Sequence, residues 1–336
     1  MTVSTTADLT AETAVASVET ITAQLAEARQ AIGEVFFGQD AVIDQVLIAL
    51  LSGGHALLVG VPGLGKTRLV ETLGQVFGLQ SKRVQFTPDL MPADILGSEV
   101  LDVADDGSRH FRFVEGPIFT QLLMADEINR ASPRTQSALL QAMQERHVAV
   151  AGFDRPLPSP FTVLATQNPI EQEGTYPLPE AQLDRFLFDI RVPYPDRATE
   201  AKILTVTTGA VQPVPKTVMT PAQLVAAQAL VRRLPVAEQV LEGILRLVRS
   251  GRPGETEANS DIVQHLEWGP GPRAAQALML ASRGRALLQG RYAPSLDDVV
   301  ALAEPVLRHR IALTYVARAE GVRPHHVISA LVREIQ

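Results

Sequence analysis

Cysteine is absent from the 336 residues of this sequence, and its absence excludes several kinds of site. Disulfides, thiolate metal centres and a cysteine nucleophile all require that side chain. Long hydrophobic runs are absent too, because no apolar segment approaches the roughly 18 residues that span a membrane. Residues 1–10 have no basic side chain and no apolar core, so they lack the pattern of a secretory signal. We therefore expect a cytoplasmic protein without a membrane span.

Basic side chains are outnumbered by acidic ones. There are 30 lysines and arginines against 37 acidic residues, which gives a net charge of −7. A nucleic-acid-binding domain usually carries a basic surface, so no nucleic-acid partner is expected. The composition is otherwise that of an ordinary globular protein, with 46% hydrophobic and 20% charged residues. A chain of this length is expected to form two or three domains.

One glycine-rich segment fits the phosphate-binding loop G-x-x-x-x-G-K-[ST], and it reads Gly60-Val61-Pro62-Gly63-Leu64-Gly65-Lys66-Thr67. A short apolar segment precedes it and a helical pattern beginning at Arg68 follows, which is the strand–loop–helix context that the motif requires. Backbone N–H groups would surround a β-phosphate, Lys66 would neutralise phosphate charge, and the Thr67 hydroxyl could bind Mg²⁺. We predict nucleotide binding at residues 60 and 62–68. The alternative is a simple glycine-rich turn between a strand and a helix.

A second motif is an apolar strand, 122–125, that ends in Asp126 and Glu127. In nucleotide hydrolases such a strand ends beside the phosphate loop. Asp126 could then hold Mg²⁺ through water, and Glu127 could polarise the attacking water. A strand that simply ends in charged residues is the alternative for this segment taken alone.

Three further polar residues are candidates for the same chemistry. Asn168 follows the next apolar strand and could orient water or contact a γ-phosphate, although an Asn-Pro pair is also a common turn. Arg185 could reach the nucleotide of a neighbouring subunit, or form a surface ion pair. Arg273 lies in the first turn of a predicted helix, where a cation opposes the helix dipole. Binding a phosphate would explain that position, and solvent exposure is the alternative.

Strand-like segments alternate with helices or loops between residues 55 and 195, which is typical of a mostly parallel α/β sheet. The predicted strands are 55–59, 83–86, 121–125, 161–165 and 187–192. Helical spacing predicts helices along an apolar stripe from Val18 to Val35 and at 40–51, 197–207, 221–233, 236–249, 272–289, 296–308 and 324–335. We therefore expect an N-terminal tail and helix (1–30), an α/β nucleotide-binding domain (31–195) and a helical lid (196–336).

Five ordered motifs together resemble the AAA+ ATPases and, within them, the MoxR group. They are GVPGLGKT (60–67), LLMADEINRA (122–131), ATQNP (165–169), LPEAQLDRF (178–186) and GPRA (271–274). The likeness extends over about residues 30–335, nearly the whole chain.

This resemblance implies a P-loop NTPase fold, with a parallel five-stranded sheet in the order 5-1-4-3-2 followed by an all-α lid. It implies a homo-oligomeric ring, expected to be a hexamer, with ATP and Mg²⁺ between neighbouring subunits. Asn168 would be the first sensor, Arg185 the arginine finger and Arg273 the second sensor, with Arg191 a less favoured finger. The residues that would hold the adenine are Val35, Phe36, Gly38 and Gln39.

The resemblance also implies two inserted β-hairpins, at 101–113 and 147–157, on the side of the ring that faces its pore or a partner. The first contains Asp105-Asp106-Gly107-Ser108, a hairpin turn signal. Plain surface hairpins are the alternative. No aromatic pore loop is evident, which weakens a simple threading mechanism.

The function that we expect is hydrolysis of Mg²⁺-ATP coupled to remodelling or maturation of a partner protein or metal-enzyme complex. Partners with von Willebrand factor A domains are expected by resemblance. Alternatives are a nucleotide-gated scaffold with slow hydrolysis and a motor like those of metal chelatases or helicases. A GTPase is disfavoured because the sequence has no N-K-x-D segment for reading guanine.

Overall fold

A parallel five-stranded sheet forms the centre of the N-terminal half in the computed structural model, which describes residues 11–103, 109–170, 174–209 and 213–336. Its strands are β1 (Ala56–Val59), β2 (Ser81–Gln85), β5 (Leu122–Asp126), β8 (Thr162–Gln167) and β9 (Phe188–Arg191). The strands lie in the order β2-β5-β8-β1-β9, and each neighbouring pair is parallel. Counted along the chain, this is the order 5-1-4-3-2, so the predicted fold is confirmed.

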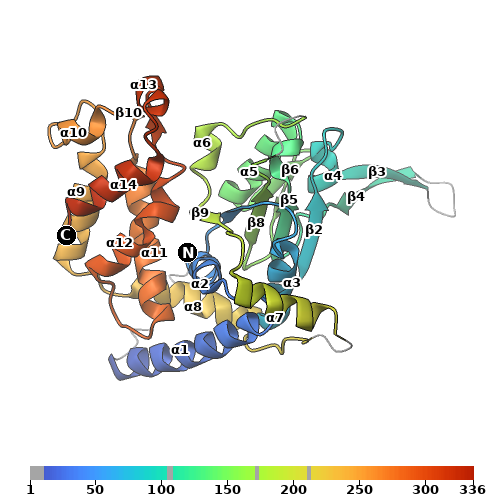
Figure 1. Ribbon diagram of the computed structural model, residues 1–336. Coiled ribbons are helices and arrows are strands. Elements are labelled where there is room, and N and C mark those ends of the chain that lie inside the picture. The colour runs from blue at the N-terminus through green and yellow to red at the C-terminus, as the bar shows by residue number, and fades with distance from the viewer. Residues whose placement is uncertain (1–10, 104–108, 171–173, 210–212) are drawn as a thin grey trace, which may run out of the picture.

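Strands β1, β5, β8 and β9 are largely buried because helices cover both faces of the sheet, whereas the edge strand β2 is mostly exposed (Figure 1). Alternate residues of β1 enter two different hydrophobic clusters, since successive side chains of a strand point to opposite faces. Ala56 and Leu58 belong to the first cluster, with α1 (Ala11–Gly33), α2 (Asp40–Leu51) and α3 (Lys66–Val76). Leu57 and Val59 belong to the second, with α5 (Pro133–Glu145).

Two antiparallel hairpins are inserted between the sheet strands, as predicted. The first pairs β3 (Gly97–Val103) with β4 (Arg109–Glu115) after the short helix α4 (Pro92–Leu96), and it projects away from the body of the molecule (Figure 1). Its predicted turn at 105–108 lies outside the described residues. The second hairpin pairs β6 (His147–Val150) with β7 (Phe153–Pro156). The short helices η1 (Ile128–Arg130) and α6 (Glu180–Leu183) follow β5 and precede β9.

The C-terminal part is helical and agrees with the helices predicted from apolar spacing. Its longer helices are α7 (Arg197–Thr207), α8 (Pro221–Arg233), α9 (Glu238–Ser250), α11 (Pro272–Leu288), α12 (Leu296–Leu307) and α14 (Pro324–Arg333). Shorter elements that the sequence did not reveal are α10 (Ser260–Val263), α13 (Tyr315–Ala319) and a small antiparallel pair of β10 (Leu266–Trp268) with β11 (Ala312–Leu313).

The helical part and the sheet share one hydrophobic core. The first cluster runs without interruption from Val18 in α1 through Leu47 in α2 and Phe188 in β9 to Leu278 in α11 and Leu331 in α14. Helix α11 packs directly on α2. The domain boundaries expected after residues 30 and 195 stay a prediction. Among the described helices, none is both long and apolar enough to cross a membrane.

Candidate nucleotide-binding site

The phosphate loop connects the carboxyl end of β1 to the amino end of α3, and it lines a cavity of about 550 Å³. Gly65 precedes the helix with φ +75°, a left-handed conformation that favours glycine. A Cβ at this position would also lie 3.3 Å from the Phe36 ring. The glycine therefore allows a tight turn, after which Lys66 and Thr67 occupy the first turn of α3.

The predicted phosphate-binding residues lie together at this cavity. Those that line it are Pro62, Gly63, Leu64, Gly65, Lys66, Thr67 and Arg68, and it is also lined by the predicted Asp126, Glu127 and Asn168. Gly60 lies at the start of the loop rather than in the lining, where a Cβ would come within 2.8 Å of the Val192 carbonyl oxygen.

Lys66 places a cation in the cavity with few compensating partners. Its Nζ donates to the carbonyl oxygens of Gly60 at 2.5 Å and Val61 at 2.9 Å, both of which are neutral groups. Partial burial lowers the pKa of Lys66, and the carboxylates of Asp126 and Glu127 oppose that shift. A polyanion in the cavity would supply a negative charge beside the Lys66 ammonium group. The loop N–H groups at the start of α3 are suited to bind a phosphate.

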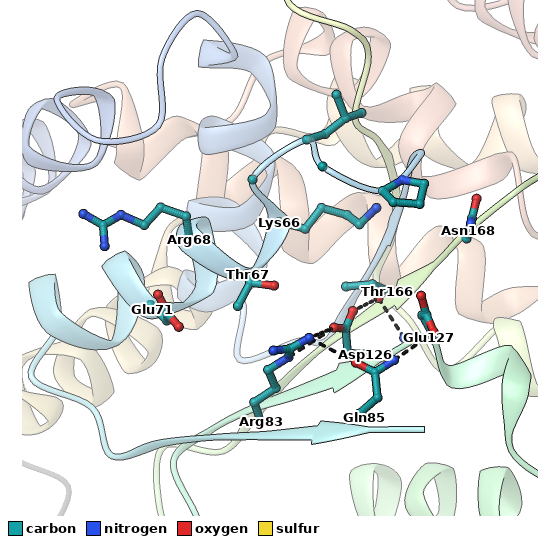
Figure 2. Close-up of a pocket in the computed structure, with 14 residues that line it drawn as sticks. Lys66, Thr67, Arg68, Glu71, Arg83, Gln85, Asp126, Glu127, Thr166 and Asn168 are labelled. Carbon is teal, nitrogen blue, oxygen red and sulfur yellow. Dashed lines mark hydrogen bonds and ion pairs between the residues drawn. The ribbon is translucent and has the colours of Figure 1, made fainter. Parts of the chain in front are cut away.

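Asp126 lies at the carboxyl end of β5 and is only 8% exposed. Its carboxylate accepts hydrogen bonds from Arg83 at 2.5 Å and from the Thr166 hydroxyl at 2.5 Å (Figure 2). The same Thr166 oxygen accepts from the Glu127 backbone N–H at 2.9 Å. A single hydroxyl of β8 therefore connects the Asp126 carboxylate to the Glu127 backbone at the carboxyl ends of β5 and β8.

Glu127 adopts a left-handed conformation with φ +54°, which turns the chain sharply after β5. Its Oε2 accepts hydrogen bonds from the Gln85 amide at 2.8 Å and from Arg130 at 2.9 Å. Asn168, at 6% exposure, follows β8, and its Oδ1 accepts from the Ile170 backbone N–H at 3.1 Å. The carboxylate of Glu127 is therefore held by neighbouring side chains within the subunit.

Sequence reasoning missed four residues that line the same cavity: Glu71, Arg83, Gln85 and Thr166. Arg83 and Gln85 alternate along β2 with the buried Val84, so a period of two was available as a signal. Their contacts depend on the pairing of β2 with β5, where Gln85 lies opposite Asp126. That pairing is not visible in the residues of either strand alone.

A second cavity, of about 340 Å³, adjoins the phosphate loop and is largely apolar. Of the residues predicted to hold adenine, Val35, Phe36 and Gln39 line it, together with the unpredicted Phe37, Pro195, Ile203 and Thr207. Gly38 is not among the lining residues. It has φ +64°, and a Cβ there would lie 2.3 Å from the Thr199 hydroxyl, so it allows α7 to approach.

Gln39 provides a buried polar group of this second cavity. Its side chain is 7% exposed, and its Oε1 has no hydrogen-bond partner among the described residues. A buried amide oxygen without a donor is unfavourable unless a ligand supplies one. An exocyclic amine of a nucleobase is a group of that kind, so the residues present fit the base of a nucleotide.

Arg185 and Arg273 lie elsewhere, at a third cavity of about 400 Å³. Gly54 and His55 also line this cavity, and both precede β1, whereas the phosphate loop follows that strand. At about 3.3 Å per residue, the four residues of β1 separate the two sites by roughly 13 Å along the strand. The two arginines therefore lie near each other at the amino end of β1, whereas the phosphate loop lies at its carboxyl end.

Arg191, the alternative finger, ends β9 and forms an ion pair with Asp189 at 2.8 Å. Burial raises the pKa of Asp189, and the charge of Arg191 opposes that shift. Within the described part of the chain, no group of three or more histidine or acidic side chains could enclose a metal ion.

Comparisons with known proteins agree with this geometry. Residues 55–188 match the family described as "ATPase family associated with various cellular activities (AAA)", and residues 259–331 match an AAA lid domain. A crystal structure of an ATPase candidate from Cytophaga hutchinsonii superposes with a TM-score of 0.88 at 33% identity, covering 97% of this chain and 98% of that one.

Curated relatives cover most of the chain. Chaperone MoxR1 of Mycobacterium tuberculosis is 41% identical over 304 residues, 90% of this chain and 80% of the relative. An uncharacterized protein, YeaC, of Bacillus subtilis is 40% identical over 93% of this chain and 92% of its own length. Protein MoxR of Paracoccus denitrificans is 32% identical over 90% of this chain and 93% of its own length. The chain is an ATP-hydrolysing enzyme, and it belongs to the MoxR family of AAA+ ATPases.

Proposed function

We propose that this chain binds Mg²⁺-ATP at the phosphate-loop cavity and hydrolyses it in a ring of identical subunits, in order to remodel or mature a partner protein. Residues 60 and 62–68 would hold the phosphates. Phe36 and Gln39 would line the base pocket, and Gly38 would shape it by allowing α7 to approach. Thr67 and Asp126 would hold Mg²⁺, whose charge would stabilise the phosphate oxygens. Glu127 would polarise the attacking water, with Asn168 beside it.

The contacts of Glu127 support its proposed role as the group that polarises water. Gln85 and Arg130 both donate to Oε2, so they orient the carboxylate, while Oε1 takes part in neither bond and would accept a hydrogen bond from water. Both partners come from the same subunit. A change at β2 or at η1 could therefore alter hydrolysis without altering nucleotide binding.

The separation of the arginines from the phosphate loop is the observation that carries the ring proposal. Arg185 and Arg273 share a cavity at the amino end of β1, and the phosphate loop lies at its carboxyl end. Neither arginine reaches the phosphates of its own subunit in this arrangement. A head-to-tail contact would bring both arginines of one subunit to the nucleotide of the next, and repetition of that contact closes a ring. We expect six subunits.

The partner-directed part of the proposal rests on the name of one relative and on an exposed hairpin. One relative is named a chaperone. The β3–β4 hairpin projects from the body with Phe111 70% exposed and Val103 58% exposed, which suits contact with another protein. A protein containing a von Willebrand factor A domain, or a metal-enzyme complex, is the partner class that we propose. A slow nucleotide-gated scaffold, or a motor of the chelatase or helicase type, is the competing function.

Mixing two inactive variants tests the shared site. Glu127→Gln lacks the catalytic carboxylate, and Arg185→Ala lacks the finger, so each alone should hydrolyse ATP at a small fraction of the wild-type rate. In a 1:1 mixture, about one interface in four pairs an intact carboxylate with an intact arginine, so about a quarter of the wild-type rate should return. A mixture no more active than its components would contradict a site shared between subunits.

The coupling of hydrolysis to a partner is tested separately with Glu127→Gln alone. This variant should bind ATP, assemble and retain a partner protein from cell extract, because the step that releases the partner is blocked. Wild-type protein in ATP and Lys66→Ala protein are the controls. If Glu127→Gln recovered only copies of this chain, the remodelling function would lose its support, and the scaffold function would be favoured.

A further inference from the structure

Arg310 is a buried cation in the connection between α12 and β11, and its side chain reaches the segment that carries Arg185. Arg310 is 6% exposed. Its Nε donates to Asp184 Oδ1 at 2.7 Å, which forms an ion pair. Burial lowers the pKa of Arg310, and Asp184 opposes that shift. Because an enclosed guanidinium is unfavourable unless its donors are satisfied, its other contacts are informative.

All five N–H donors of this guanidinium are used. Nη1 donates to the carbonyl oxygens of Leu187 at 3.2 Å and Val306 at 2.6 Å. Nη2 donates to the carbonyl oxygens of Asp184 at 3.2 Å and Phe186 at 2.7 Å. Carbonyls just beyond a helix end have no partner within the helix, and α6 ends at residue 183. Arg310 therefore fixes the backbone on both sides of residue 185.

The neighbouring histidine strengthens the same attachment. The Nε2 atom of His309 lies 3.0 Å from the carbonyl oxygen of Phe186, and His309 is 7% exposed. Burial, with the charge of Arg310, lowers the pKa of His309 well below its ordinary value, so the ring is neutral. Two consecutive residues of the helical lid thus bind the segment that precedes β9.

Asp184 joins this attachment to the second arginine of the cavity. Its other oxygen, Oδ2, lies 3.7 Å from Nη1 of Arg273 on α11. Arg185 itself takes no part in a salt bridge among the described residues, and its Nε is buried without a hydrogen-bond partner there. The backbone that carries Arg185 is therefore held firmly by the lid, while the Arg185 charge has no anionic partner among the described residues.

We propose that Arg310 is a positioning residue for ATP hydrolysis, which holds residues 184–187 so that Arg185 reaches the nucleotide of the neighbouring subunit. This inference rests on the proposed function, because it takes Arg185 as the finger. A displacement of about 1 Å in a positioned catalytic group can cost about a hundredfold in rate. A lysine at position 310 has three donors on one nitrogen and cannot replace the five donors of the planar fork.

The test measures ATP hydrolysis by Arg310→Lys, Arg185→Ala and the double variant. Arg185→Ala should lose about a thousandfold in kcat. Arg310→Lys should lose roughly 10- to 100-fold in kcat, with the affinity for a fluorescent ATP analogue unchanged because the nucleotide cavity is intact. The double variant should be no slower than Arg185→Ala alone, since residues that act through one another are not additive.

Two companion variants separate positioning from folding. Arg291→Lys alters another ion pair of the lid, between the partly exposed Arg291 and the buried Asp298 at 2.5 Å, away from the cavity lined by Arg185. It should lower thermal stability while keeping the wild-type kcat. Asp184→Asn removes the charge that pairs with Arg310 and leaves the backbone carbonyls in place, so it should show the kcat loss and the non-additivity of Arg310→Lys. This second variant keeps the test decisive if Arg310→Lys does not fold.

The outcomes distinguish the two proposals. Full activity in Arg185→Ala would overturn the shared-site function and, with it, the role of Arg310. An inactive Arg185→Ala beside a fully active Arg310→Lys would overturn the role of Arg310 alone. Multiplication of the two losses in the double variant would also overturn it, because Arg310 would then act independently of Arg185.

Discussion

His55, at the amino end of β1, should make the stability of this protein depend on pH. The ring is enclosed, with 7% of the residue exposed. The Val163 backbone N–H donates to its Nδ1 at 2.9 Å, so its Nε2, 3.1 Å from the Met143 carbonyl oxygen, must carry the proton. Burial, with a smaller contribution from the charge of Arg146, lowers the pKa of His55 to about 4.

The sign and the magnitude follow from linkage. The unfolded chain takes up this proton near pH 6.5 and the folded chain only near pH 4, so between these values the unfolded state binds more protons. The free energy of unfolding therefore decreases as the pH falls from 7 to 4. At about 1.4 kcal/mol per pH unit, the loss from His55 is about 2 kcal/mol at pH 5 and about 3 kcal/mol at pH 4.

Urea unfolding of wild type and His55→Gln, followed by circular dichroism at pH 7.5 and pH 5, measures the contribution of His55 to the free energy of unfolding. At pH 7.5 the variant should be about 1–3 kcal/mol less stable, because the Val163 N–H loses its acceptor. At pH 5 the difference should shrink by about 2 kcal/mol. His309 remains in both proteins, so its own titration cancels. A difference between the two proteins that does not change with pH would refute the assignment.

Three shorter predictions concern the nucleotide site and the lid. Thr166→Val removes the hydroxyl that bonds both the Asp126 carboxylate and the Glu127 backbone N–H, so kcat should fall by roughly tenfold or more. Thr162→Val, on the same strand, removes a buried hydroxyl without a partner in the described chain and should keep full activity in the same assay. Gly38→Ala forces a side chain into a left-handed conformation and against α7, so a fluorescent nucleotide should bind roughly tenfold more weakly. Gly254→Ala, which has φ +84° in open space, is its control, and equal weakening would argue against a role for the α7 contact. Asp298→Ala leaves Arg285 and Arg291 without their buried carboxylate. Because these two side chains are 25% and 36% exposed, the free energy of unfolding should fall by about 1.5–3 kcal/mol, whereas an unchanged urea midpoint would contradict that network.

The central strands could be predicted because a buried parallel strand is a short apolar run bounded by turns. Residues 122–126 illustrate this, since the run ends at the acid where the strand ends. The phosphate loop could also be predicted from the sequence, because its backbone geometry needs glycine at fixed positions. The strand order had a different source: it followed from the resemblance to AAA+ ATPases and not from any pattern within the strands.

Contacts between strands and the location of the arginines could not be predicted. Arg83 reaches Asp126 only because β2 pairs with β5 in one particular register. Strands β10 and β11 have three and two residues, which is too short for a period of two to be recognised. The resemblance to AAA+ ATPases gave Arg185 and Arg273 the roles of arginine finger and second sensor. That the two line one cavity depends on how α11 packs beside the amino end of β1. That packing is a property of the assembled core.

The continuous core between the sheet and the lid restricts how a subunit can move. Opening a hinge between the two parts would expose apolar side chains of α2 and α11 that are now enclosed, such as Leu47 and Leu278, and each such side chain is worth about 1.5–3 kcal/mol. A lid attached in this way moves with the sheet as one rigid body. We therefore expect the mechanical response of this protein to nucleotide to be concentrated in the joints between subunits, where one rigid copy tilts against the next.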